Sequence, residues 1–301
     1  MENWNDIILT INNHTQEAFE LDSVSSVGGG CINQAWHLKG NVETELLSDN
    51  SARDYFVKSN SRSGLNMFEA EYDALLEIQK SKTIRVPTPI VTGSGKDSSW
   101  LVLEYISLSG SGGEQQLGRQ LAAMHDCVNE RFGWVVDNTI GSTEQINTQC
   151  ESWVDFWRDY RLGFQLETAA KNGYGGRLQT LGDQLMSGLE VFFEGHTPIA
   201  SLLHGDLWGG NWSCASTGEP VIYDPATYYG DRETDIAMTE LFGGFSGAFY
   251  RAYEECSPLD EGYQTRKVLY NLYHILNHLN LFGGGYGSQA ESMMKQLLSD
   301  F

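Results

Sequence analysis

The chain has 301 residues, of which 41% are hydrophobic and 12% aromatic, enough to bury the core of one large domain or of two lobes. It carries 19 Lys and Arg against 40 Asp and Glu, and this formal charge of -21 argues against nucleic-acid binding. Such a charge favours solubility or a cationic substrate, and a merely solvated acidic surface explains it equally well.

The cysteines and the amino end indicate a reducing compartment. The five cysteines are widely spaced without a C-x-x-C pair, which indicates neither a disulfide framework nor a zinc site. The acidic amino end lacks the apolar segment of a signal peptide, and no run of about 18 apolar residues occurs. We therefore expect a cytoplasmic protein that does not span a membrane.

The first part of the chain is predicted to contact phosphate. Residues 1–21 have the apolar spacing of a short amphipathic helix. Two β-like runs follow, joined by Gly28, Gly29 and Gly30, whose N–H groups could face phosphate oxygens. Alone, a glycine-rich hairpin is more often just a turn, and the pattern departs from the G-x-G-x-x-G of protein kinases.

Cys31 directly follows these glycines. Phosphate-facing N–H groups at this position would favour its thiolate and make it sensitive to oxidation. A small apolar filler is an equally good interpretation. The choice between a monomer and a redox-sensitive dimer stays open.

A lysine and two acids come next. After a polar stretch over residues 40–52, a strand is predicted around Lys58, which either snorkels at an edge or holds the α- and β-phosphates of a nucleotide. Its place after the glycine loop favours the second role. Residues 66–80 have helical spacing, and Glu69 and Glu71 flank their apolar stripe on opposite sides. Helix geometry alone leaves open which acid would pair with Lys58.

A change in composition indicates a hinge. A buried-looking strand that ends at Ile106 is followed by a Ser- and Gly-rich stretch. We therefore expect an ATP-binding lobe over residues 1–106 and a catalytic, substrate-binding lobe over 107–301. Backbone groups from Glu104 to Ile106 could pair with an adenine.

The second lobe is predicted to be mainly helical, because apolar residues recur every three and four positions. The expected helices cover residues 114–129, 151–172, 178–194, 245–256 and 264–282. A further helix begins near Asp231 and Asp235, acids of the kind that helix amino ends favour. Either acid caps that helix or braces a catalytic loop.

The catalytic loop itself is predicted in the stretch His204-Gly-Asp-Leu-Trp-Gly-Gly-Asn211, which follows an apolar run. Asp206 and Asn211 lie five positions apart, the spacing of a phosphotransferase catalytic loop. In that interpretation Asp206 is the base and Asn211 is a magnesium ligand.

A hairpin is predicted directly after Asn211, because residues 211–215 and 220–224 flank a Ser-Thr-Gly-Glu turn. If residue 215 pairs with residue 220, Asn211 lies opposite Asp224, roughly 4.5 to 5.5 Å away. An amide oxygen and a carboxylate could then hold the same hard cation. The alternative is an ordinary turn with an ordinary acid at a strand end, but the matched spacing favours phosphoryl transfer.

Together these elements predict the α+β class and a two-lobed protein-kinase-like fold, with a small β-rich N-lobe and a larger, mainly helical C-lobe. The chain also resembles the fructosamine kinase (ketosamine kinase) family, in the aminoglycoside-phosphotransferase-like branch of this fold. The matching segments are residues 28–33, 67–71, 132–134, 138–147, 204–211, 223–226 and 270–282. The Trp-Gly-Gly-Asn ending of the catalytic loop and the segment 138–147 distinguish this family from other small-molecule kinases.

The resemblance implies that ATP phosphorylates the sugar 3-hydroxyl of a ketosamine, after which the adduct releases its free amine. It also implies the roles of individual residues. Lys58 would hold the α- and β-phosphates with Glu71 rather than Glu69 as its partner, and Trp208 would lie beside the acceptor sugar. The polar stretch 40–52 is longer than a tight hairpin needs, so the edge of the first sheet stays undefined.

Two other interpretations are weighed against this one. A kinase for an aminoglycoside or for choline would need only the shared His-Gly-Asp core and the later Asp, without the segment 138–147. An inactive fold used as a binding module would have lost at least one of four residues that are all present: Lys58, Asp206, Asn211 and Asp224.

Overall fold

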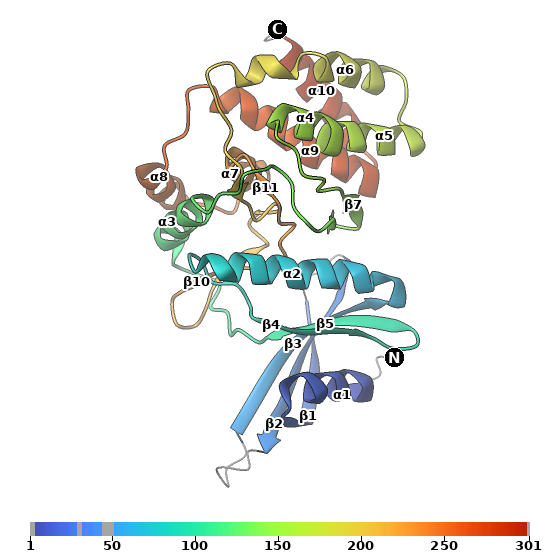
Figure 1. Ribbon diagram of the computed structural model, residues 1–301, viewed down its shortest axis with the longest axis vertical. Helices are drawn as coiled ribbons and strands as arrows, with labels where there is room; N and C mark the ends of the chain where they lie inside the picture. The colour runs from blue at the N-terminus through green and yellow to red at the C-terminus, as the bar shows by residue number, and fades with distance from the viewer. Residues whose placement is uncertain (1–3, 29–31, 44–50, 300–301) are drawn as a thin grey trace. The chain divides into compact units, whose positions relative to one another are not determined.

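The structure is a computed structural model that describes residues 4–28, 32–43 and 51–299 (Figure 1). The chain forms two compact units, one made of residues 1–111 and 213–223, the other of 112–212 and 224–301. The first is rich in strands and the second mainly helical, as the sequence predicts. Residues 213–223 belong to the first unit, although the expected division into residues 1–106 and 107–301 assigns them to the second lobe.

The first unit is built on a five-stranded sheet in the order β1-β2-β3-β5-β4, with every neighbouring pair antiparallel. Its strands are β1 (Ala18–Val27), β2 (Gln34–Glu43), β3 (Ser51–Ser61), β4 (Pro89–Ser94) and β5 (Ser98–Glu104). Helix α1 (Trp4–Thr15) is shorter than the predicted helix 1–21, because residues 18–21 already belong to β1. Strand β2 continues to Glu43 and so includes the first residues of the polar stretch 40–52.

The two faces of this sheet have different partners. On one face, Val57 and Val102 pack with Ile7 and Ile11 of α1 in a buried core. On the other, Lys58 reaches α2 (Leu65–Ser81), which follows a 3-10 turn at Arg62–Gly64. Figure 1 shows α1 and α2 on opposite sides of the sheet. The alternation of a strand thus sends Lys58 away from the apolar core.

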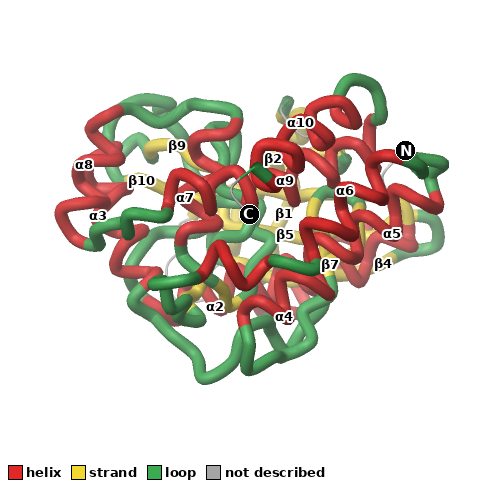
Figure 2. Tube along the Cα trace, turned by 90° about the horizontal axis from the view of Figure 1, so that it is seen from above, coloured by secondary structure: helices red, strands yellow, loops and turns green. Residues whose placement is uncertain are grey.

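The second unit is a helical assembly around α9. Its helices are α3 (Glu114–His125), α4 (Trp153–Trp157), α5 (Phe164–Lys171), α6 (Arg177–Met186), α7 (Glu233–Leu241), α8 (Gly247–Cys256), α9 (Tyr263–Phe282) and α10 (Tyr286–Leu298). Helix α9 contacts α5, α7 and α10. Helices α3 and α8 lie side by side (Figure 2), and Gly118 permits this approach because a Cβ there would lie 2.5 Å from the Phe249 carbonyl oxygen.

Short strand pairs connect the helices and carry the functional loops. They are β6 (Asn138–Ile140) with β7 (Thr143–Gln145), β8 (Ser201–Leu202) with β11 (Tyr229–Gly230), and β9 (Trp212–Cys214) with β10 (Pro220–Ile222). The β9-β10 pair is the predicted hairpin, but its register differs from the expected one, because the Ala215 N–H donates to the Glu219 carbonyl at 2.8 Å and residue 215 does not pair with residue 220.

The helices of the second unit also differ in places from the predicted ones. The predicted helix 151–172 contains a π-helical turn at Arg158–Gly163, and the helix predicted over 178–194 ends at Met186, before a 3-10 turn at Leu189–Phe193. The final helix α10 was not predicted, although its buried residues Ala290, Met294 and Leu297 have helical spacing.

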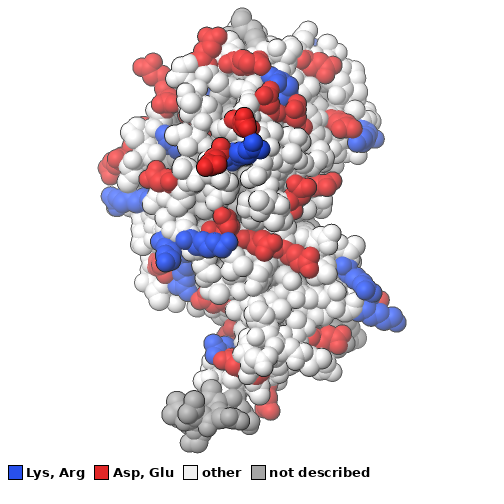
Figure 3. Space-filling view, viewed as in Figure 1, with Lys and Arg blue, Asp and Glu red and all other residues white. Residues whose placement is uncertain are grey.

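Acidic side chains are spread over the face seen in Figure 3, with fewer basic side chains among them. This distribution agrees with the formal charge of -21. Every helix within the described residues is too short or too polar to cross a bilayer.

Candidate active site

The catalytic loop leaves strand β8 and is held by its backbone. The carboxylate of Asp235 accepts hydrogen bonds from the N–H groups of His204, at 2.7 Å, and of Gly205, at 2.8 Å. Asp235 lies in the first turn of α7 and is buried. Asp235 therefore connects α7 to both residues that precede Asp206. Of the two roles considered for Asp235, helix cap or brace of the catalytic loop, the structure supports the brace.

Further buried contacts hold Asp235 in place. His125 contacts the Asp235 carboxylate through Nε2 at 3.1 Å and the Tyr253 hydroxyl through Nδ1 at 2.8 Å. Burial alone would raise the pKa of Asp235, but hydrogen bonds and charges, first those of His125, outweigh it and lower the pKa. Asp231 lies just before α7, and its carboxylate accepts from the N–H of Glu233, the first residue of that helix, at 3.0 Å.

Only glycine fits at position 205. Its φ is +82°, in the left-handed region, and a Cβ there would lie 2.0 Å from the Ala226 carbonyl oxygen. The Ala226 N–H in turn donates to the His204 carbonyl at 2.9 Å. The catalytic loop and the segment after Asp224 are therefore in direct contact.

Asp206 and Asn211 are joined across the loop. The amide nitrogen of Asn211 donates to the Asp206 carbonyl oxygen at 2.9 Å and to its carboxylate at 3.2 Å. Desolvation raises the pKa of Asp206 to about 7, and the charge of Asp224 adds to the effect, whereas the Asn211 hydrogen bond opposes it. A carboxyl with a pKa near neutrality can take up and release a proton under physiological conditions.

The residues present fit a magnesium ion. Because the Asn211 amide nitrogen is committed to Asp206, the Asn211 oxygen is directed elsewhere and can serve as a ligand. Asp224 has a φ of +59°, a conformation that Asp tolerates at a cost and that is common at functional sites. Its charge contributes to the raised pKa of Asp206.

The turn that contains Trp208 depends on its glycines. A Cβ on Gly210 would lie 2.3 Å from the Trp208 ring, and one on Gly209 would lie 3.0 Å from the Gly243 carbonyl oxygen. The indole ring therefore covers one glycine while remaining 40% exposed. An exposed aromatic ring two residues after Asp206 is a surface on which a sugar could stack.

The first unit contains the predicted lysine and its partner. Lys58 Nζ lies 2.5 Å from Glu71 Oε1, with the two side chains only 8% and 10% exposed. Glu69 is exposed. In the structure, Glu71 and not Glu69 is therefore the acid that pairs with Lys58.

The other predicted nucleotide contacts are less defined. Gly28 is exposed, while Gly29, Gly30 and Cys31 lie outside the described residues. The Glu104 side chain bonds Arg85 at 2.8 Å, and its N–H donates to the Thr88 carbonyl at 2.8 Å. The carboxylate and N–H of Glu104 are therefore engaged within this unit, and an adenine contact at residues 104–106 remains a prediction.

Buried side-chain amides form a hydrogen-bond network next to the segment after Asp224. The sequence analysis does not predict this network. Asn138 donates to the Thr227 carbonyl at 2.8 Å, and Gln145 donates to the Ala226 carbonyl at 3.1 Å and to Asn138 at 2.8 Å. Asn147 also donates to Asn138, at 3.0 Å. These side chains hold the backbone just after Asp224. The signal was available, because the segment 138–147 contains several amides with apolar neighbours.

Two further side chains complete the network. The buried Arg161 donates to Asn147 at 2.7 Å, and its guanidinium lies 4.1 Å from the centre of the Tyr228 ring. Tyr273 donates to Gln145 at 2.7 Å. Arg161 thus orients the Asn147 amide, and Tyr273 of α9 orients the Gln145 amide.

Comparison with known proteins places this geometry in a family. A family model described as fructosamine kinase matches residues 3–300. The chain is 45% identical to a "Probable ketoamine kinase" of Synechocystis, covering 98% of this chain and 97% of that one. It is 42% identical to the chloroplastic protein-ribulosamine 3-kinase of Arabidopsis thaliana, covering 94% of this chain and 84% of that one.

Solved structures agree on the fold. A crystal structure from Haemophilus somnus, described as a fructosamine-3-kinase, is 29% identical with a TM-score of 0.85, covering 98% of this chain and 97% of that one. The choline kinase LicA from Streptococcus pneumoniae is 15% identical with a TM-score of 0.59, both chains being covered completely. At that identity the second likeness concerns the fold alone, which is the predicted α+β protein-kinase-like fold.

Proposed function

The chain belongs to the fructosamine kinase family, and we propose that it transfers the γ-phosphate of ATP to the 3-hydroxyl of the sugar in a ketosamine. The observation that carries the proposal is similarity over nearly the full length to ketoamine and ribulosamine kinases. The arrangement of Asp206, Asn211 and Asp224 supports it, because their chemistry suits phosphoryl transfer to an alcohol.

In this proposal the Asp206 carboxylate accepts the proton of the attacking hydroxyl. The brace from Asp235 and the hydrogen bond from Asn211 fix the direction of that carboxylate. Lys58, oriented by Glu71, neutralises charge on the α- and β-phosphates.

Magnesium would be held by the Asn211 oxygen and the Asp224 carboxylate, and when bound it neutralises phosphate charge. Trp208 would offer its ring to the acceptor sugar. The phosphorylated adduct then breaks down and releases the free amine, so the outcome is deglycation.

A substrate panel tests the proposal. Phosphate transfer from ATP would be measured on ribulose-lysine, fructose-lysine, kanamycin and choline at matched concentration, with and without enzyme. We expect transfer to at least one lysine adduct. Efficient transfer to kanamycin or choline, with none to the adducts, would favour the alternative that the protein-kinase-like fold also permits.

A further inference from the structure

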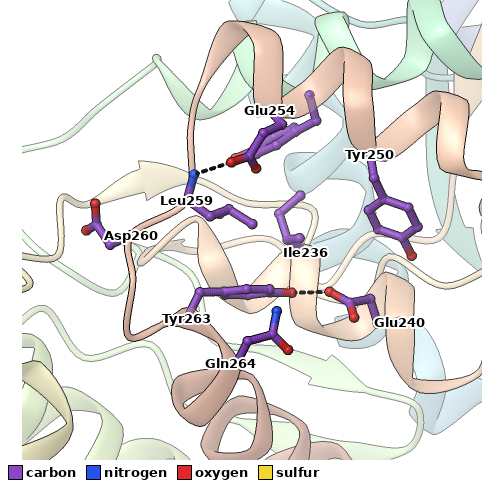
Figure 4. Close-up of a pocket in the computed structure, with 9 residues that line it drawn as sticks. Ile236, Glu240, Tyr250, Glu254, Leu259, Asp260, Tyr263 and Gln264 are labelled. Atoms are coloured by element: carbon purple, nitrogen blue, oxygen red, sulfur yellow. Dashed lines mark hydrogen bonds between the residues drawn. The ribbon is translucent and has the colours of Figure 1, made fainter.

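A pocket of ≈ 360 Å³ lies in the second unit, between α7, α8 and the start of α9 (Figure 4). It is lined by Ile236, Glu240, Tyr250, Tyr253, Glu254, Leu259, Asp260, Tyr263 and Gln264. None of the residues assigned above to catalysis, magnesium or sugar is among them. Its volume suits a small ligand or a single long side chain.

Three tyrosines, Tyr250, Tyr253 and Tyr263, contribute to the wall. Tyr263 donates its hydroxyl proton to Glu240 at 2.5 Å, as Figure 4 shows, and the Tyr253 hydroxyl contacts Arg232 at 3.0 Å. These contacts fix the two rings from their polar ends. The Tyr263 ring already lies 5.8 Å from the Lys267 ammonium, within the range in which a ring attracts a cation.

The charged lining residues are all acids. Glu240 pairs with Lys267 at 2.8 Å, and Asp260 pairs with His196 at 2.5 Å. Glu254 differs, because it accepts only the Leu259 N–H, at 3.4 Å, and has no ion pair among residues 4–28, 32–43 and 51–299. The pocket therefore combines tyrosine rings with an exposed acid, Glu254, that makes no ion pair within the described part of the chain.

We propose that this pocket binds an ammonium or guanidinium group carried on a short alkyl chain, the chemistry of a lysine or arginine side chain. The tyrosine rings would attract the cation and cover the alkyl stem, while Glu254 would supply the opposite charge. The ligand would lie against Ile236, the residue that follows Asp235 on α7. This site is separate from the proposed ketosamine site and does not depend on it.

Calorimetric titration of the full chain tests the proposal. The probe is Nα-acetyl-lysine methylamide, and the control is Nα-acetyl-norleucine methylamide, which has the same alkyl stem without the charge. We expect binding of the lysine compound that weakens as salt is added, and weaker binding of the norleucine compound. Equal binding of the two, or none of the lysine compound at millimolar concentration, would overturn the proposal.

Two adjacent acids provide a matched pair of variants. Glu254→Gln should weaken binding of the lysine compound about five- to tenfold. Glu255→Gln makes the same change on the next residue, which is exposed like Glu254 but pairs with Arg119 and does not line the pocket, and it should leave affinity within about twofold. Equal effects of the two variants would mean that the cation binds elsewhere and that the proposal is wrong.

A further variant tests the aromatic wall, and two further probes distinguish sources of the ligand. Tyr250→Leu keeps apolar volume but removes the ring, so it should also weaken binding, and unchanged affinity would contradict the role of the rings. Free lysine carries a carboxylate that the acids would repel, whereas acetyl-Gly-Lys-Gly-amide does not. Tighter binding of the peptide would identify a side chain on a polypeptide as the ligand, and tighter binding of free lysine would identify the amino acid.

Discussion

Asp206 combines a fixed position with an unusual pKa. The Asp235 carboxylate holds the two preceding backbone N–H groups, so the loop has little freedom to move the Asp206 side chain. Desolvation and the charge of Asp224 bring its pKa to about 7. Both properties suit a residue that receives a proton during phosphoryl transfer.

Replacing Asp206 should separate chemistry from nucleotide binding. Asp206→Asn removes the proton acceptor but no predicted phosphate contact, so kcat should fall by roughly 10² to 10⁴ while ATP affinity stays nearly unchanged. Asp224→Ala should instead weaken the magnesium-dependent binding of ATP. Steady-state kinetics and nucleotide titrations measure the two effects, and near-normal turnover of Asp206→Asn would contradict the assigned role.

His196 should make stability depend on pH. Burial lowers its pKa, but hydrogen bonds to Asp231 and Asp260, at 2.7 and 2.5 Å, and the charges of Asp231 and Glu233 outweigh burial and raise it. A raised pKa contributes stability that is complete below the unfolded pKa of about 6.5 and is lost as pH rises through the folded value. The Arg266 guanidinium faces this cluster through its pair with Glu233.

The measurement is the free energy of unfolding of His196→Gln and of wild type as a function of pH. We expect the variant to be less stable by about 1 to 2 kcal/mol near pH 6 and the difference to shrink at alkaline pH. His14→Gln, the same change at an exposed position, should have little effect at either pH. A difference that grows with increasing pH would contradict the raised pKa of His196.

At the scale of elements, the β6-β7 segment acts on the active site through side-chain amides. Asn138 and Gln145 bond the carbonyls of Thr227 and Ala226, directly after Asp224. Because buried amides are costly when their partners are lost, the network favours one backbone path through this segment. The same residues lie in the segment 138–147, on which the resemblance to the family rests in part, and the network gives that segment a structural role.

Gln145→Met should destabilise the protein by about 2 to 4 kcal/mol, because it removes buried hydrogen bonds to Asn138, to Tyr273 and to the Ala226 carbonyl. Gln184→Met, the same substitution at an exposed position, should cost under about 0.5 kcal/mol. Urea denaturation measures both. Equal losses in the two variants would show that the network contributes no stability.

The pair between β3 and α2 supports a second prediction at this scale. Glu71→Gln should raise the KM for ATP and lower kcat/KM roughly 10-fold or more, because Lys58 loses the partner that orients it. Glu69→Gln, two residues away and exposed, should have kinetics close to those of wild type. If Glu69→Gln has the larger effect, the assignment of the partner is wrong.

The sequence predicts elements whose signals are local. The hairpin after Asn211 follows from its turn residues, and α2 follows from apolar spacing. The end of α1 was placed too late, because residues 18–21 contain both helix- and strand-forming types and pairing with β2 decides between them. The π-helical turn in Arg158–Gly163 has no local signal of this kind.

The same distinction applies to the candidate site. Spacing predicts Asp206, Asn211 and Asp224 as site residues, whereas the choice of Glu71 over Glu69 came from the family resemblance. The brace from Asp235 links residues 30 or more positions apart, so only tertiary structure could single it out from Asp231. The amide network likewise depends on contacts across more than 80 positions.

On the scale of the whole molecule, charge and chain path are the main features. Residues 213–223 belong to the first unit although they lie between segments of the second. The local sequence does not indicate that the chain passes back to the first unit here. The charge of -21 suits a substrate that is cationic at neutral pH, as the secondary amine of a glycated lysine is. An aminoglycoside is also cationic, so charge alone does not distinguish the two acceptors.

The position of the transferred phosphate is therefore the critical test of the proposed 3-kinase activity. Ribulose-lysine and fructose-lysine would be incubated with the enzyme, ATP and magnesium, and the product examined by phosphorus–proton NMR. If the enzyme is a ketosamine 3-kinase, the product will show phosphorus coupled to the proton on sugar carbon 3, and free lysine will then appear. Phosphate on another hydroxyl, or no transfer to either adduct by enzyme that phosphorylates kanamycin or choline, would contradict the proposed activity.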